Sequence, residues 1–130
     1  MKKIKSVLCV VFALMVLLCG CGAKTPLEKA EKQIKKWNKD GLYECTYETD
    51  FEEDKFGLGL DVYNVHMTDF CWDDYTDFYK MYSLNNNLPK VYDELRNIFG
   101  ADSSVVIIIR YYDGDGNLLY TTIDGEDFVD

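Results

Sequence analysis

The first 22 residues decide how much of the chain is available to fold. Three lysines lie among residues 1–5, residues 7–19 form an unbroken apolar run, and Gly20, Cys21 and Gly22 follow it. This order of cationic, apolar and small residues is typical of a secretory signal peptide. A membrane-spanning helix needs about 20 apolar residues, whereas roughly 10–14 suit the apolar part of a signal peptide. The run of 13 residues therefore favours a cleaved signal over a spanning anchor.

Residues 18–21 resemble the lipobox of bacterial lipoproteins. In that resemblance Leu18 lies at −3 and Cys19 at −2, followed by Gly20 at −1 and Cys21 at +1. Cys19 departs from the family, in which Ala, Ser or Thr is usual at −2. The resemblance implies that residues 1–20 are removed, that Cys21 is acylated, and that the mature protein stays on the extracytoplasmic face of the cell membrane. One acyl chain binds a bilayer only marginally and two anchor stably; the lipoprotein modification installs at least two.

Cleavage leaves 110 residues, enough for one small domain: residues 21–25 as a short tether and 26–130 as the domain. Eleven Lys and Arg oppose 23 Asp and Glu in this part, a net charge of about −12. Six lysines lie in 24–39, whereas 21 acids oppose five cations from residue 40 onward. An anionic bilayer would attract the basic stem and repel the acidic body; a solvated helix face beside an acidic domain is the alternative. No basic patch on the body suits nucleic acid.

A helix is predicted directly after the tether. Thr25 is a typical N-cap, Pro26 suits the first helical position, and Glu28 completes a capping box. Apolar residues recur at helical spacing through this segment, and Gly41 supplies its end. The sequence therefore predicts a one-faced helix that buries its apolar stripe against the rest of the domain.

The remaining segments complete an α+β fold. Alternating or continuous apolar residues predict two antiparallel pairs of strands, at 43–49, 56–62, 105–109 and 118–123. The run 105–109 is β-branched throughout, which is typical of a central or fully covered strand. Helices are predicted toward the end of 68–82 and over 89–99. We expect a single small domain with a mostly antiparallel sheet of about four strands and with helices on one face.

An aromatic stripe is the first candidate for a ligand-binding surface. Trp72, Tyr75, Tyr79 and Tyr82 are spaced so that they share one face of a helix. Core packing is the ordinary explanation, because a small domain needs large apolar groups to offset chain entropy. If ring surface is left exposed, a patch for a peptide or a glycan is the alternative.

A calcium loop is the alternative to a plain hairpin after the 105–109 strand. Oxygen-bearing residues match positions 1, 3, 5 and 12 of an EF-hand loop, at Asp113, Asp115, Asn117 and Asp124. Leu118 occupies the sixth position, which requires Gly, and the flanking segments are strands where an EF-hand has helices. Asp-Gly between alternating strands is a strong hairpin signal, so we expect a hairpin and no metal.

The cysteines and the single histidine offer few routes to catalysis. After Cys21 is acylated, Cys45 and Cys71 are left, and an exported chain can join them in one disulfide or bury both as thiols. His66 could pair with either thiol, yet no local signature supports this, and a lone histidine is more often structural. We expect no cofactor.

The functional expectation follows from location and charge. No nucleophile motif is present. A small envelope hydrolase would need a pair of carboxylates, but acidic residues are so abundant that the presence of such a pair does not indicate a hydrolase. We therefore expect a lipid-anchored, non-catalytic binding module whose protein or envelope ligand is cationic. A carboxylate hydrolase and an inhibitor or immunity-type protein are the alternatives.

Overall fold

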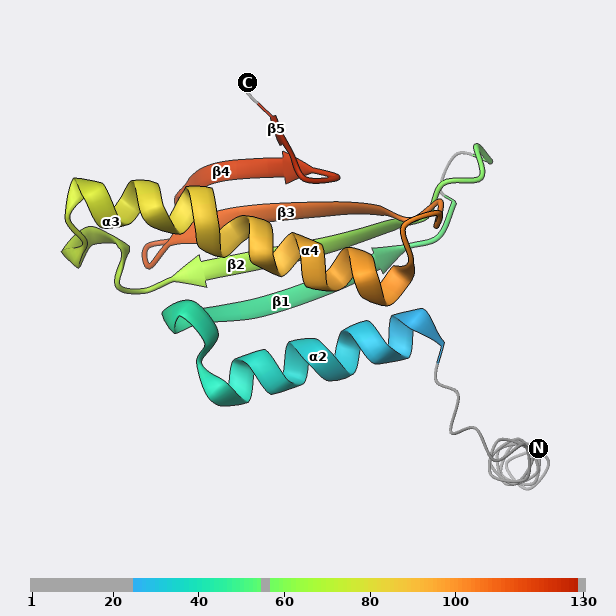
Figure 1. The fold of residues 1–130 in the computed structure, drawn as a ribbon, viewed down its shortest axis with the longest axis horizontal. Coiled ribbons are helices and arrows are strands. Elements are labelled where there is room, and N and C mark those ends of the chain that lie inside the picture. The colour runs from blue at the N-terminus through green and yellow to red at the C-terminus, as the bar shows by residue number, and fades with distance from the viewer. Residues whose placement is uncertain (1–24, 55–56, 129–130) are drawn as a thin grey trace.

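The computed structural model describes residues 25–54 and 57–128, so the predicted signal peptide and Cys21 lie outside the described residues. Figure 1 shows a twisted sheet with helices along it. The main elements are α2 (Pro26–Asp40), β1 (Cys45–Glu52), β2 (Val62–Asp69), α3 (Asp77–Tyr82), α4 (Leu88–Phe99), β3 (Val106–Asp113), β4 (Leu118–Ile123) and β5 (Glu126–Phe128). Short 3-10 turns lie at Leu42–Glu44 and Trp72–Asp74, and a turn of π-helix at Ser83–Asn87 joins α3 to α4. None of the helices in these two ranges is long and apolar enough to cross a membrane.

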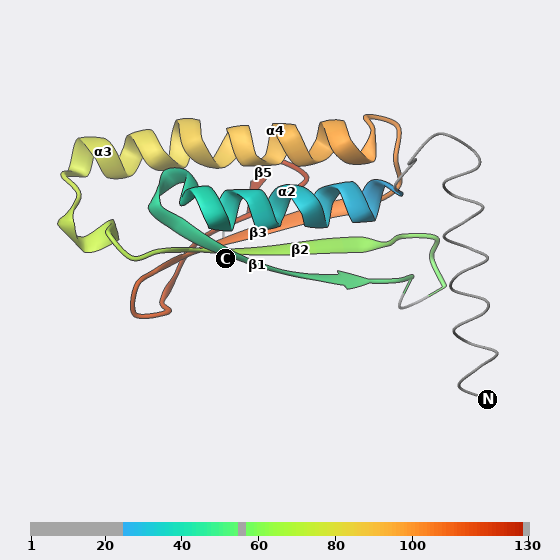
Figure 2. The same cartoon turned by 90° about the horizontal axis from the view of Figure 1, so that it is seen from below.

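The sheet is mixed, with the strand order β1-β2-β3-β4-β5. Only β2 and β3 run parallel, and the other neighbouring pairs are antiparallel. A parallel pair needs a crossover connection, which α3, the π-turn and α4 provide. Figure 2 shows α2, α3 and α4 on one face of the sheet. The predicted α+β class and the one-sided helices are thus confirmed, with a fifth short strand added after β4.

Local sequence signals set the start and end of α2. The Thr25 hydroxyl accepts a hydrogen bond from the Glu28 backbone N–H at 3.2 Å, and Gly41 ends the helix in the left-handed region at a φ of 65°. The helix buries Ala30, Ile34 and Trp37. This stripe packs against β1 and α4, as the periodicity predicted.

The second strand lies later in the chain than predicted. The sequence placed it at 56–62, but β2 begins at Val62, and residues 57–60 form an exposed, bent loop. Gly57 and Gly59 adopt φ values of 67° and 75°, which a strand does not contain. The antiparallel hairpin itself is confirmed, and His66 lies in the middle of β2.

The core lies between the sheet and the helices. It is built from apolar side chains of β1, β2 and β3 and of α2 and α4: Ala30, Ile34, Trp37, Cys45, Tyr47, Tyr63, Val65, Met67, Leu88, Val91, Leu95, Phe99, Ile107, Ile109 and Tyr111. In the β-branched run, Ile107 and Ile109 are buried, while Val106 and Ile108 face the other side and are half-buried. The run therefore marks a central strand covered by helices on one face only.

Candidate functional site

The parallel strands β2 and β3 end at the same edge of the sheet. Their last residues, Asp69 and Asp113, are partners in the ladder, and both are buried. Loops that follow the carboxyl ends of parallel strands gather at one edge, where ligands commonly bind in open sheets that contain parallel strands. Here the gathered segments are residues 70–76, α3 and the turn 114–117 between β3 and β4.

A buried polar network anchors these segments to the sheet. One Asp69 carboxylate oxygen accepts from the Tyr75 hydroxyl and the Cys71 backbone N–H, each at 3.0 Å. The other oxygen accepts from the Tyr111 hydroxyl, which also lies 3.1 Å from the Ser83 hydroxyl. Burial, and then the bond to Asp69, raises the pKa of Tyr111, so its hydroxyl stays protonated and donates. A fully satisfied buried network of this kind gives its segments one fixed arrangement.

The four aromatic residues singled out in the sequence are in contact, although they do not share one helix. Trp72 lies in a 3-10 turn, Tyr75 in a loop, and Tyr79 and Tyr82 in α3, which begins only at Asp77. Successive ring centroids are 6.2, 4.5 and 5.9 Å apart. The inner end of this row packs on the core, because Trp72 lies 5.5 Å from the Tyr111 ring. The outer end, Tyr79 and Tyr82, is exposed.

Further apolar side chains extend the exposed end. Phe78 is 80% exposed and Met81 is 59% exposed, and α3 has no buried residue. Residues three and four apart are neighbours on a helix surface, so these side chains adjoin Tyr79 and Tyr82. We define the α3 patch as Phe78, Tyr79, Met81 and Tyr82. Sequence reasoning missed two of its members, although a six-residue helix with four large apolar residues cannot bury them all on one face.

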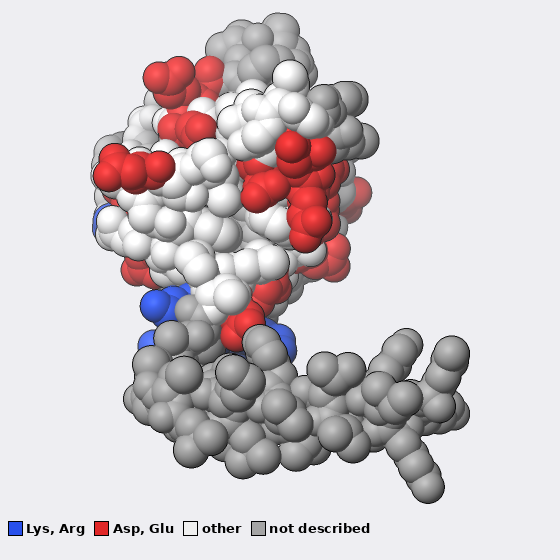
Figure 3. Space-filling view, turned by 90° about the vertical axis from the view of Figure 1, so that its right-hand side faces the viewer, with Lys and Arg blue, Asp and Glu red and all other residues white. Residues whose placement is uncertain are grey.

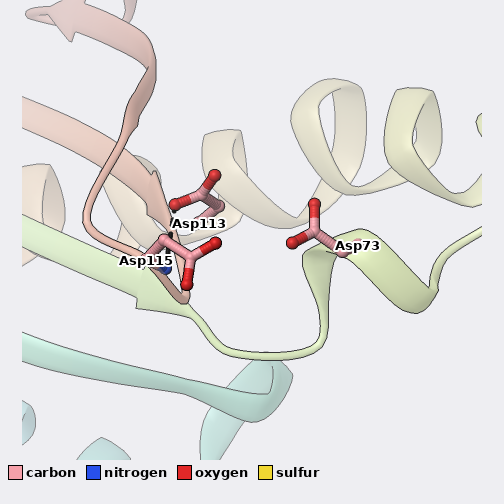
Figure 4. A group of neighbouring side chains, drawn as sticks. All are labelled: Asp73, Asp113 and Asp115. Carbon is pink, nitrogen blue, oxygen red and sulfur yellow. Dashed lines mark hydrogen bonds between the residues drawn. The ribbon is translucent and has the colours of Figure 1, made fainter.

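Acidic side chains lie beside the same edge. Carboxylate oxygens of Asp73, Asp113 and Asp115 lie within 4.8 Å of one another (Figure 4). A Cβ added at Gly114 would lie 3.2 Å from the Phe70 Cα, which shows how closely the β3–β4 turn approaches the segment that follows β2. This close approach brings Asp73 to the other two, a proximity that sequence spacing did not indicate.

The β3–β4 turn is a hairpin held by Asp113. Its carboxylate accepts from the Asn117 side chain at 3.0 Å and from the backbone N–H groups of Asn117 and Asp115 at 2.9 and 3.0 Å. These bonds, led by the Asn117 side chain, lower the pKa of Asp113, which stays ionised. Asp124 lies beyond the other end of β4, where it accepts from Arg96 at 2.6 Å. The four residues of the calcium alternative are therefore not brought together.

Cys45 and Cys71 are both free thiols in the structure. The Cys45 thiol donates to the Tyr43 carbonyl at 3.4 Å, and the Cys71 thiol donates to the Glu44 carboxylate at 3.0 Å. Burial raises the pKa of Cys45 to about 12, and the hydrogen bond to Glu44 raises the pKa of Cys71. Both thiols are protonated at neutral pH and are weak nucleophiles. A disulfide between them stays a prediction.

His66 lies away from both thiols, on the helix-free face of the sheet. Its ring nitrogens lie 2.9 Å from the Tyr112 hydroxyl and 3.4 Å from an Asp50 carboxylate oxygen. Beside it, Asn64 donates to Asp50 at 3.1 Å and accepts from Arg110 at 3.1 Å. These contacts satisfy polar side chains across β1, β2 and β3, and they give His66 a structural role.

Comparisons of the chain with protein-family models, with curated proteins and with solved structures find no match. The functional argument therefore depends on the geometry of the carboxyl-end edge of β2 and β3.

Proposed function

We propose that the chain is a lipid-anchored protein of the extracytoplasmic face of the cell membrane, and that it binds a protein partner through the α3 patch. The lipid anchor is supported by residues 1–21, with their signal-peptide pattern and the lipobox-like sequence that ends at Cys21. The observation that carries the binding role is that α3 leaves all four of its large apolar side chains exposed.

The exposure of the α3 patch has no explanation within the domain. The core is already covered by α2 and α4, which bury their apolar faces against the sheet. Contiguous exposed apolar side chains on a small domain mark an interaction site. The base of the patch is held by the Asp69 network, so little conformational freedom is lost when a partner binds.

The charge next to the patch indicates the chemistry of the partner. Exposed carboxylates flank α3 on the preceding turn and at its first residue: Asp73, Asp74 and Asp77. Opposite charges across an interface accelerate association and disfavour wrong partners. We therefore propose a partner segment with apolar side chains flanked by lysine or arginine. An inhibitor or immunity-type role would use the same surface, with a cationic enzyme or toxin as the partner.

The geometry favours binding over carboxylate hydrolysis. A general acid needs a raised pKa so that it holds a proton at neutral pH. Within the group of Asp73, Asp113 and Asp115, Asp113 is the buried member, and its hydrogen bonds lower its pKa. It therefore suits a turn-stabilising role rather than proton donation.

Photo-cross-linking in intact cells of the native host tests the binding role. We expect p-benzoylphenylalanine placed at Phe78 to give one discrete protein adduct. The same group placed at Asp93, an exposed residue of α4, is the matched control and should give none. Equal adducts at both positions, or no adduct at either, would contradict the proposal. The anchor is tested separately by mass spectrometry, which should find an acylated Cys21 at the N-terminus.

A further inference from the structure

The outer face of α2 carries the main concentration of positive charge on the described residues. Five exposed lysines lie on it, at Lys29, Lys32, Lys35, Lys36 and Lys39. Their spacing of three, four and seven residues places them on the side of the helix opposite Ala30, Ile34 and Trp37, which are buried. Within 25–54 and 57–128, none of the five ammonium groups lies within 4.0 Å of a carboxylate. We call this surface the lysine face.

Nearby acids do little to neutralise the lysine face. Glu31 turns toward the sheet, where its carboxylate accepts from the Thr49 hydroxyl and the Tyr63 hydroxyl, each at 2.9 Å. Two exposed acids remain against the five lysines, Glu28 in the first turn of α2 and Asp40 at its last residue. Figure 3 shows the contrast on one side of the molecule, where the basic side chains in view lie mainly at the lower end and the acidic ones form separate patches over the rest.

The lysine face is also the part of the domain closest in sequence to the proposed anchor. Only three residues lie between Cys21 and the N-cap Thr25, so four residue-to-residue steps separate them. An extended chain spans roughly 3.5 Å per residue, so the start of α2 lies within about 14 Å of Cys21. Electrostatic attraction to a charged surface extends over a Debye length of about 8–10 Å. The fully extended tether is longer than this range, so the tether lets the lysines reach the charged surface, and their own charge must hold them there.

We propose that the lysine face of α2 lies on anionic lipid headgroups of the membrane to which Cys21 is attached. This inference rests on the lipid anchor of the proposed function, and it adds a second contact that fixes the orientation of the domain. Each lysine near an anionic surface strengthens the contact by roughly fivefold. The same surface repels the acidic body. Attraction of the lysine face and repulsion of the body therefore favour the same orientation, with α2 toward the membrane. The β1 edge of the sheet then lies nearest the membrane and the β4–β5 edge farthest from it (Figure 1).

Lysine labelling of the full, lipidated protein on vesicles tests this orientation. The protein is bound to phosphatidylcholine vesicles, or to vesicles of equal parts phosphatidylcholine and phosphatidylglycerol. The rate of acetylation of each lysine is then measured by mass spectrometry. We expect the lysines of α2 to react several-fold more slowly on the anionic vesicles only. Lys90, exposed in the first turn of α4, is the control and should react equally on both. The protection should disappear near 1 M salt, where the Debye length is about 3 Å.

A charge variant sharpens the test without changing the core. Lys32→Gln, Lys35→Gln, Lys36→Gln and Lys39→Gln together keep good helix formers at exposed positions. In this variant Lys29 should lose its protection on anionic vesicles. Flotation of the protein with both vesicle types but equal labelling on both would overturn the lysine-face contact and leave the anchor intact. Failure to float with neutral vesicles would overturn the anchor itself, and the inference with it.

Discussion

The two helices of the β2–β3 crossover use their apolar residues in opposite ways. The second helix, α4, buries Leu88, Val91, Leu95 and Phe99 along one face. The first helix, α3, has four large apolar residues out of six and buries none of them. Both helices belong to one continuous helical connection between the same two strands. The difference shows that α4 suffices to cover this part of the sheet, and that the apolar content of α3 is not needed by the fold.

The junction between the two helices accentuates this difference. Residues Ser83–Asn87 form a turn of π-helix, in which Ser83 and Asn87 are buried. Single π-turns within helices occur frequently at functional sites. Ser83 also joins the Asp69 network through its contact with Tyr111. The buried junction after α3 is thus tied to the Asp69 network, while α3 itself projects its apolar side chains outward.

The largest predicted effect comes from the buried helix. Leu95→Ala removes a fully buried side chain and should lower the free energy of unfolding by about 2–5 kcal/mol. Met81→Ala is the matched change on α3 and should stay within about 0.5 kcal/mol. Urea denaturation followed by circular dichroism measures both. Similar losses in the two variants would break the comparison, because α3 would then contribute to the core.

The next effect concerns the network that supports α3. Asp69→Asn replaces one carboxylate oxygen, which accepts a hydrogen bond, with an amide N–H₂ group that can only donate. A hydroxyl donor of the network then loses its acceptor, and the free energy of unfolding should fall by about 1–3 kcal/mol. Amide hydrogen exchange should also accelerate over 70–79 more than over α4. A loss of stability spread evenly over the domain, with no preference for these residues, would show that the network does not hold the α3 region in particular.

The smallest effect is a pH dependence at the β3–β4 turn. The pKa of Asp113 is lowered in the folded protein, so its stabilising contribution is present above the ordinary aspartate pKa of about 3.9 and is lost as the pH falls through the folded value. Asp113→Asn should therefore be less stable than the parent protein at pH 7, and the difference should shrink below about pH 4. A difference that stays constant across this range would argue against an ionised Asp113 in the turn.

Local signals were sufficient to predict much of the fold. Thr25 and Gly41 set the bounds of α2, and Asp113 with Gly114 identified the turn between β3 and β4. The second strand was misplaced because residues 57–60 alternate between glycine and leucine as a strand could, while both glycines adopt left-handed conformations. Periodicity predicts which residues share a face of a strand or helix. It contains no information on local backbone angles, such as the positive φ values that prevent a strand here.

The candidate site was predicted only in part, for a different reason. The row from Trp72 to Tyr82 was recognised by its spacing, but exposure depends on whether another element has already covered the sheet. The approach of Asp73 to Asp113 likewise joins residues 40 positions apart through the pairing of β2 with β3. Such contacts are consequences of tertiary packing, which no local pattern contains.

One experiment tests most directly whether the α3 patch serves a partner rather than the fold. The cross-linker p-benzoylphenylalanine is placed at Tyr82, with and without the double substitution Phe78→Ser and Met81→Ser, and adduct formation is measured in intact cells. We predict that the adduct disappears in the double variant while its free energy of unfolding stays within about 0.5 kcal/mol of the parent protein. An adduct that persists in a folded double variant, or a double variant that no longer folds, would contradict the account.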